Sequence, residues 1–283
     1  MTIEQFYKTY PQQTMKINGK DFRYRYHKNE NAKATLVLLT GGIGLSDLFY
    51  NHFGRFAQDF SVITFDYLME YSTMGGLADA ACELFRKLDV KVWLVGQSLG
   101  GAAAQIFTKR NPDRIEGLVL SNTCPIVSRG GAGEYFEEMK KRQTKSRRLI
   151  RFIPWGIAKK VMMKAIDKKV EKLPPEGREE FAELAQVMFT MLTKNYELHM
   201  IDMLLDCGNY FDMKKEDFVQ LRDRVLLILS DDDETFSDDC RKELTELMTE
   251  PTVINDMGGG HLGALMQIEE YAKTVTDYIS ERS

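Results

Sequence analysis

The chain has 283 residues, a length that suits one large α/β domain with an insertion or two modest domains. Its composition, 43% hydrophobic and 28% charged, is that of an ordinary globular protein. The net charge of −4 gives no overall reason to expect nucleic-acid binding, and no uninterrupted apolar stretch is long enough to span a bilayer. We therefore expect neither a nucleic-acid partner nor stable membrane insertion.

The cysteines and the first residues indicate a cytoplasmic protein. Cys82, Cys124, Cys207 and Cys240 lie far apart in the sequence and form no C-x-x-C pair. The N-terminal sequence M-T-I-E-Q-F-Y-K-T-Y-P contains no apolar core of a signal peptide. We expect isolated, reduced thiols in a cytoplasmic protein.

The first elements predict a hairpin followed by a buried strand. Asn18-Gly19 stands between flanks that alternate apolar with polar residues, which predicts an antiparallel hairpin over residues 14–27 at the sheet edge. The apolar run Leu36 to Leu39 predicts a strand buried on both faces. It leads into T-G-G-I-G, residues 40–44. This turn lacks the G-K-[ST] ending of a phosphate-binding loop, but its backbone N–H groups suit an oxyanion.

Strands and helices then alternate. A helix is predicted from Ser46 to Phe56, and we expect its His52 to be structural. A second helix face, with i, i+4, i+7 spacing, covers residues 77–88. The strands expected in this part of the chain cover residues 62–65, 92–95 and 117–120. This order predicts an α/β fold, a mostly parallel, doubly wound sheet of about eight strands with helices on both faces.

The strand ending at Val95 runs into G-Q-S-L-G-G-A-A-A, in which Ser98 stands between Gly96 and Gly100. Strand, sharp turn and helix is the arrangement that presents a serine hydroxyl above a parallel sheet. A side chain at either glycine position would crowd such a turn. The pattern therefore predicts that Ser98 is a nucleophile, which needs a base within hydrogen-bond reach.

The alternation stops at Pro125. Residues 125–218 contain no convincing strand and predict a helical cap, broken at Leu173-Pro174-Pro175, that is inserted into the sheet domain. The expected domains are thus a first core part (1–124), the cap and a second core part (219–283).

Charge is unevenly distributed within the predicted cap. Glu134 to Lys172 holds 13 Lys or Arg against 5 Asp or Glu, and Leu173 to Gln220 holds 4 against 10. We interpret these segments as two solvated helix faces that attract each other, with a binding surface as the alternative. An apolar stripe that includes Phe152, Trp155 and Val161 accompanies the basic residues. We expect this stripe to pack in the core, although an interfacial helix has the same pattern.

The sheet pattern returns at Val225 to Leu229, which is followed by S-D-D-D-E, residues 230–234. Such a loop can bind a divalent metal, form a solvated turn or supply one carboxylate that orients a histidine, and we favour the last. The final strand, Val253-Ile254, leads to G-G-G-H, which ends at His261, and a helix from about Ile268 to Ile279 follows. His261 is thus the histidine placed to act as the base.

Serine, acid and histidine follow one another in the order of the α/β hydrolases, and the chain resembles that superfamily over nearly its whole length. The matching stretches are T-G-G-I-G, V-G-Q-S-L-G-G, N-P-D-R-I-E-G-L-V-L-S-N, L-S-D-D-D-E-T-F and G-G-G-H-L. The resemblance implies that Ser98 is the nucleophile, His261 the base and Asp233 the acid. Asp231 and Asp232 are rivals because a one-residue shift of the loop would exchange them.

The resemblance also implies oxyanion donors, namely the backbone N–H groups of Leu99 and Gly42, with Ile43 as the second choice. Relatives often have His-Gly in the first glycine turn, where this chain has Thr40-Gly41. Cys124 follows a predicted strand and borders the expected site, but we interpret it as a small buried thiol.

The nucleophile indicates the reaction. Relatives that open epoxides or displace halide use Asp at that position, so Ser98 disfavours those reactions. Similarity to carboxylesterases implies a serine hydrolase that cleaves a small or medium acyl ester through an acyl-enzyme, with a small-molecule substrate and no cofactor or metal. C–C, amide or thioester hydrolysis or acyl transfer on the same triad is an alternative. A non-catalytic interaction protein on a hydrolase scaffold is another.

Overall fold

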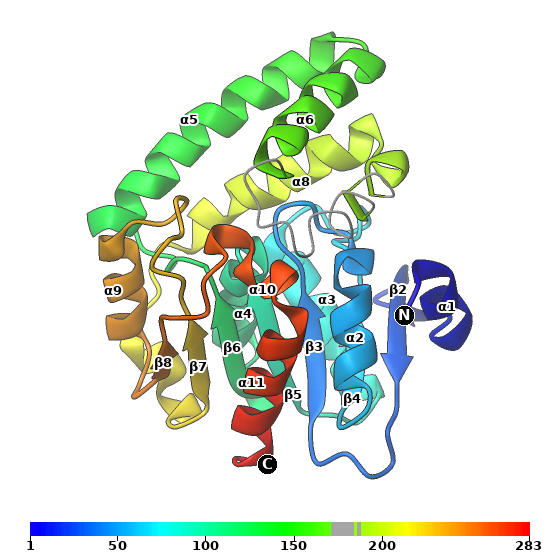
Figure 1. The fold of residues 1–283 in the computed structure, drawn as a ribbon, viewed down its shortest axis with the longest axis vertical. Helices are drawn as coiled ribbons and strands as arrows, with labels where there is room; N and C mark the ends of the chain where they lie inside the picture. Colours follow the sequence, from blue (N-terminus) through cyan, green and yellow to red (C-terminus); the bar gives the residue numbers. More distant parts are fainter. Residues whose placement is uncertain (171–183, 186–187) are drawn as a thin grey trace.

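The computed structural model describes residues 1–170, 184–185 and 188–283. The described residues form one eight-stranded sheet covered by helices on both faces, as the sequence predicted (Figure 1). The first two strands pair antiparallel, β2 pairs antiparallel with β4, and the remaining neighbours are parallel. In spatial order the strands are β1 Gln13–Ile17, β2 Lys20–His27, β4 Ser61–Thr64, β3 Thr35–Leu39, β5 Val92–Gln97, β6 Ile115–Ser121, β7 Val225–Ile228 and β8 Thr252–Ile254.

Helices on the two faces cover two apolar cores, because the central strands are apolar on both sides. In β3, Leu36 and Leu38 belong to one core and Val37 and Leu39 to the other. Complete burial of each such side chain contributes roughly 1.5–3 kcal/mol. In Figure 1, α2 and α11 lie in front of the sheet, and α3 and α4 lie behind it. The bounds of these helices are α2 Tyr50–Phe56, α3 Met74–Lys87, α4 Leu99–Arg110 and α11 Ile268–Ser280.

The N-terminal hairpin is confirmed. Asn18 and Gly19 both adopt positive φ angles, 50° and 79°, which a two-residue type I′ turn requires. This turn places Ile17 opposite Lys20 and sets the register of β1 and β2. The short helix α1 Ile3–Thr9, which the sequence analysis did not predict, precedes the hairpin.

The helix predicted from Ser46 to Phe56 is present, but it consists of two segments of different helix type. Residues Ser46–Phe49 form a 3₁₀ helix, and α2 begins only at Tyr50. The Asp66 carboxylate accepts hydrogen bonds of 2.7 Å from both the N–H and the hydroxyl of Ser46, the first residue of the 3₁₀ helix. These bonds fix the start of the 3₁₀ helix.

We call the chain between β6 and β7 the helical insertion. It contains the helices of the predicted cap. Among the described residues they include α5 Gly130–Phe152, α6 Trp155–Val170 and α8 Lys194–Asp206, which lie over one end of the sheet (Figure 1). Arg147 on α5 forms two hydrogen bonds, of 2.6 and 3.1 Å, to the carboxylate of Asp202 on α8. The predicted break at Leu173-Pro174-Pro175 lies outside the described residues.

The apolar stripe that we expected to pack in the core divides into two sets. Trp155 and Met162 are partly buried against the core, whereas Phe152, Ile157 and Val161 are exposed. Periodicity identifies the stripe, but it does not identify which neighbour covers each side chain. Within the described part of the chain, no helix is both long and apolar enough to cross a bilayer.

Candidate active site

Ser98 lies in a strained turn between β5 and α4. Its backbone angles, φ 55° and ψ −118°, are rare for a residue with a side chain. Strained backbone of this kind is found mainly at functional sites. A Cβ atom at Gly96 would lie 2.3 Å from the carbonyl oxygen of Gly100, and one at Gly100 would lie 1.9 Å from that of Leu39. Both positions therefore require glycine, and together they let β5 turn sharply and present the serine.

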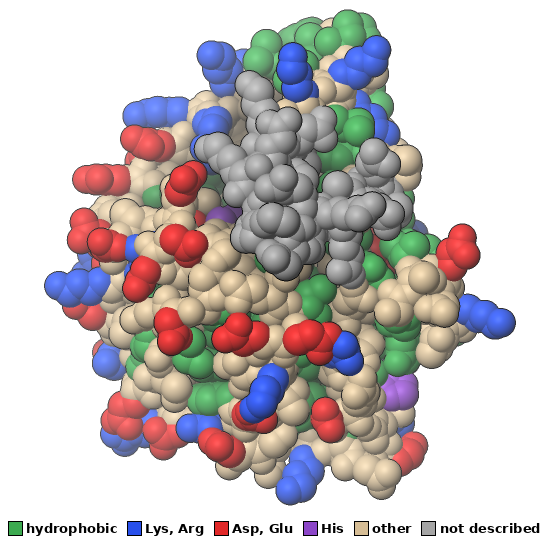
Figure 2. All heavy atoms as spheres, in the orientation of Figure 1, with side chains coloured by type: hydrophobic (Ala, Val, Ile, Leu, Met, Phe, Trp, Pro, Cys, Tyr) green, Lys and Arg blue, Asp and Glu red, His purple; other side chains and the backbone are tan. Residues whose placement is uncertain are grey.

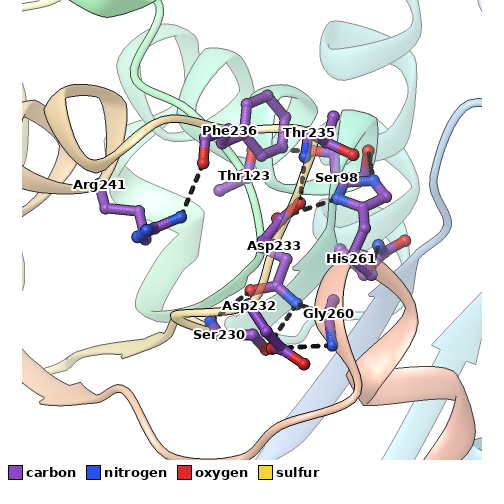
Figure 3. A network of polar contacts seen from close by, with 12 residues as sticks. Ser98, Thr123, Ser230, Asp232, Asp233, Thr235, Phe236, Arg241, Gly260 and His261 are labelled. Carbon is purple, nitrogen blue, oxygen red and sulfur yellow. Dashed lines mark hydrogen bonds and ion pairs between the residues drawn. The ribbon is translucent and has the colours of Figure 1, made fainter.

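The structure brings Ser98, His261 and Asp233 into one hydrogen-bonded line (Figure 3). The distance from His261 Nε2 to Ser98 Oγ is 3.0 Å, and that from His261 Nδ1 to Asp233 Oδ2 is also 3.0 Å. When Nδ1–H donates to the carboxylate, Nε2 is free to accept the serine proton. Asp231 and Asp232, the rival acids, are exposed, whereas Asp233 is only 7% exposed.

The surroundings of Asp233 favour its ionised form. Burial opposes ionisation, but the hydrogen bond and charge of His261 and the hydrogen bonds of Thr235 together outweigh burial and lower the pKa of the Asp233 carboxyl. The Thr235 N–H also donates to Asp233 Oδ1 over 2.7 Å (Figure 3). An ionised carboxylate at this place fixes the tautomer and the orientation of the imidazole.

Asn122 ties together the loops that carry the acid and the histidine. Its Nδ2 donates to Ser230 Oγ over 3.1 Å and to the Gly260 carbonyl oxygen over 2.7 Å. The Ser230 N–H donates back to Asn122 Oδ1 over 2.8 Å. The sequence analysis missed this buried side chain. Its position directly after β6, at the edge where the other site residues lie, was the available indication.

A second contact joins the loop of His261 to the turn that carries Ser98. Gln97 Nε2, on the residue before Ser98, donates to the His261 carbonyl oxygen over 2.9 Å. The Thr123 hydroxyl donates to the Ser98 carbonyl oxygen over 2.7 Å. Ser98 and His261 are therefore each held through their backbones as well as through their side chains.

Two predicted oxyanion donors, Leu99 and Gly42, line the same pocket as Ser98. Leu99 is the first residue of α4, so its N–H has no acceptor within the helix. Ile43, the second choice, packs against the apolar core on the α2 side. Leu99 and Gly42 thus line the pocket beside Ser98, and both remain the predicted donors, with Ile43 as the second choice.

Two tyrosines that the sequence analysis did not identify hold the glycine turn. The Tyr67 hydroxyl donates to the carbonyl oxygen of Thr40 over 2.9 Å. The Tyr196 hydroxyl, from α8 of the helical insertion, donates to that of Gly44 over 2.7 Å. The turn with Thr40 in place of histidine is therefore fixed by partners from both the sheet domain and the insertion.

A pocket with a volume of about 200 Å³ opens beside Ser98 and His261. The sheet domain and the insertion both contribute to its wall, which is largely apolar. Besides Ser98, His261, Leu99 and Gly42, the lining residues include Ala102, Thr123, Cys124, Tyr135, Phe136, Arg142, Gln143, Leu204, Cys207, Thr235 and Phe236. Cys124 is 3% exposed, and burial raises the pKa of its thiol, so the thiol is neutral.

His52 lies in the core between α2 and the C-terminal helices. Its Nε2 donates to the Ala264 carbonyl oxygen over 2.7 Å, and burial lowers its pKa to about 4 despite this bond. This setting fits the structural role that the sequence predicted. Among the residues that the structure describes, no three His, Cys, Asp or Glu side chains lie close enough to hold a metal ion.

Comparison with known proteins finds no matching family model. A segment of 84 residues, 29% of this chain, is 37% identical to a putative 2-succinyl-6-hydroxy-2,4-cyclohexadiene-1-carboxylate synthase of Bacillus subtilis (strain 168). The match spans 28% of the length of that protein.

Two solved structures resemble this one over nearly the whole chain. A thermophilic esterase from Thermogutta terrifontis, with malate bound, has 18% identity and a TM-score of 0.69 over 95% of this chain and 98% of its own. MenH from S. aureus has 18% identity and a TM-score of 0.71 over 91% of this chain and 98% of its own. At these identities the similarity establishes the fold.

Proposed function

We propose that this chain, which has the α/β-hydrolase fold, is a serine hydrolase that cleaves a small or medium acyl ester through an acyl-enzyme on Ser98. The observation that carries the proposal is the line from Ser98 through His261 to Asp233, with 3.0 Å at each step. A serine on a strained turn with an oriented histidine is the arrangement that activates a hydroxyl at neutral pH.

Each site residue has one task in the proposed reaction. Asp233 accepts the hydrogen bond of Nδ1–H, and His261 Nε2 takes the Ser98 proton as Oγ bonds to the ester carbonyl carbon. The Leu99 and Gly42 N–H groups stabilise the oxyanion, and His261 then gives its proton to the departing alkoxide. Water then gives a proton to His261 as its oxygen attacks the acyl carbonyl carbon, and His261 returns this proton to Ser98 Oγ as the acid departs.

The size of the pocket supports a small acyl group. Its volume of about 200 Å³ lies below the range of about 300–1,000 Å³ that is typical of sites for drug-sized ligands. Phe136 on α5 and Leu204 on α8 give the wall an apolar part from the insertion. We therefore assign residues 125–218 as a cap that selects the acyl group, inserted between core parts 1–124 and 219–283.

A panel of p-nitrophenyl esters with acyl chains of increasing length tests this proposal. We expect hydrolysis that is fastest for short chains, with a burst of p-nitrophenol in the first turnover. Thioester, amide and C–C substrates in the same panel separate the other reactions of the triad. Cleavage of one of those classes with no ester cleavage would replace the ester assignment, and no cleavage of any class would favour a non-catalytic role.

A further inference from the structure

Large apolar side chains are exposed where α5 ends and α6 begins. The exposed fraction is 53% for Leu149, 83% for Phe152, 56% for Ile157 and 64% for Val161. We call these four residues the apolar tip. Figure 2 shows hydrophobic side chains gathered with basic ones at the top of the molecule, over the α5–α6 end of the insertion. A cluster of this kind on a protein surface indicates a binding site.

The same segment carries a concentrated positive charge. Between Met139 and Lys164 the sequence contains ten Lys or Arg and no Asp or Glu, in a chain with a net charge of −4. Arg147 pairs with Asp202, and among the described residues no carboxylate pairs with the exposed cations of this segment. These exposed cations are Lys140, Lys141, Arg142, Lys145, Arg148, Arg151, Lys160 and Lys164.

Cations and apolar side chains share one stripe on each helix. Lys145, Arg148, Leu149 and Phe152 stand at positions i, i+3, i+4 and i+7 of α5. The same spacing on α6 relates Ile157, Lys160, Val161 and Lys164. Residues with this spacing lie on one side of a helix. The cations therefore border the apolar tip directly.

We propose that the apolar tip and its cations dock this protein onto the surface of an anionic lipid bilayer. Such a surface has negative headgroups that attract Lys and Arg. It also has an acyl-chain boundary in which Phe, Leu, Ile and Val can be buried. A nucleic acid would pair with the cations but would leave the aliphatic side chains in water. A second copy docked tip to tip would bring two sets of exposed cations together, which like-charge repulsion disfavours.

Helix α5 connects the tip to the pocket. Tyr135 and Phe136, near its start, line the pocket, and Phe152 at its end belongs to the tip. Docking therefore fixes the orientation of the pocket relative to the bilayer. The docking step itself uses no residue of the proposed triad, so Ser98→Ala should bind vesicles as the wild type does.

Flotation of the full chain with large vesicles tests the proposal. At about 0.15 M salt we expect the protein to float with phosphatidylcholine vesicles that contain about 30% phosphatidylglycerol, and not with pure phosphatidylcholine. At about 1 M salt, where the Debye length is about 3 Å, the bound fraction should fall strongly. No flotation with the anionic vesicles would overturn the proposal.

Matched variants separate the two parts of the surface. Val161→Ser together with Phe152→Ser should weaken binding at least about tenfold, and so should Lys145→Glu with Arg148→Glu. Val219 is 53% exposed on the short helix Lys215–Leu221, so Val219→Ser is the apolar control, and Lys33→Glu is the charge control. Both controls should bind as the wild type does.

Three further results would contradict the proposal. One is vesicle binding that the tip variants leave unchanged. The second is that the protein binds RNA and not vesicles, and the third is that it forms a dimer in light scattering. In both cases the tip variants would abolish the interaction. All substituted side chains are exposed, so thermal unfolding of the variants should match that of the wild type and show that they are folded.

Discussion

The Gly260 N–H donates a hydrogen bond of 3.0 Å to Asp232 Oδ1 (Figure 3). Gly260 directly precedes His261, and Asp232 directly precedes Asp233, so this bond joins the two loops one residue before the proposed base and acid. Neighbouring aspartates thus have different environments: one side chain bridges the loops from the surface, and the next is buried against the imidazole.

We expect Asp233→Asn to lower kcat for a short p-nitrophenyl ester by about 10³–10⁴-fold, because the amide no longer holds the correct imidazole tautomer. Asp231→Asn should leave kcat unchanged, since that side chain is exposed. Asp232→Asn keeps an oxygen acceptor for Gly260 and should cost only a fewfold. Steady-state kinetics of the three variants provide the check, and equal small losses in all three would show that the orienting acid is misassigned.

Asn122→Gly should reduce kcat about 10²-fold with little change in KM, because small displacements of His261 and Asp233 are costly to catalysis. Glycine is the suitable replacement, since Asn122 has a positive φ of 39°. Asn209→Gly removes an exposed asparagine in the helical insertion and is the control, with kinetics expected to match the wild type. Wild-type kcat in folded Asn122→Gly would rule out this positioning role.

Gly100→Ala should destabilise the protein by at least about 2 kcal/mol, since the added Cβ would lie 1.9 Å from the Leu39 carbonyl oxygen. Gly156 in α6 has no atom within 4 Å of an added Cβ. Gly156→Ala is therefore the matched control, with an expected gain of about 0.5–1 kcal/mol from helix propensity. Urea unfolding measures both free energies. Wild-type stability of Gly100→Ala would mean that the turn is wider than described.

His52 should make the protein sensitive to acid. Its pKa is about 4 in the folded state, below the usual value of 6.5, so the unfolded state binds the proton more tightly. The stabilisation is complete above pH about 6.5 and is lost as the pH falls toward about 4, with a loss of about 2 kcal/mol between pH 7 and pH 5.

His52→Gln retains an Nε2 donor for the Ala264 carbonyl oxygen but does not titrate in this range. The variant should therefore lack that part of the acid sensitivity. Unfolding free energies of the two proteins in urea at pH 7 and pH 5 give the comparison. The same loss in both proteins would place the acid-sensitive group elsewhere.

Local steric requirements made the N-terminal hairpin and the turn at Ser98 predictable from the sequence. The hairpin turn needs two positive φ angles, which Asn18 and Gly19 tolerate, and the turn at Ser98 has no room for a Cβ atom at Gly96 or Gly100. Strand β3 was predictable because it is buried on both faces and is therefore apolar throughout. In each case, the residues that decide the structure are neighbours in the sequence.

The parts that could not be predicted depend on distant contacts. Asn122 meets Ser230 and Gly260 across more than a hundred residues of sequence. The choice among three consecutive aspartates depends on a turn in which the Asp233 N–H donates to the Ser230 carbonyl oxygen over 3.0 Å. The exposure of Phe152 could not be predicted either, because periodicity shows that an apolar stripe exists but not which neighbour covers it.

Covalent labelling of Ser98 tests the central claim most directly. A fluorophosphonate reacts only with a serine whose hydroxyl is activated, and intact mass followed by peptide mapping locates the adduct. We predict one adduct per chain, on the peptide that contains Ser98, with no adduct and no ester cleavage in Ser98→Ala. Wild-type protein that takes up no label and cleaves no activated ester, or an adduct that persists in Ser98→Ala, would contradict the proposed function.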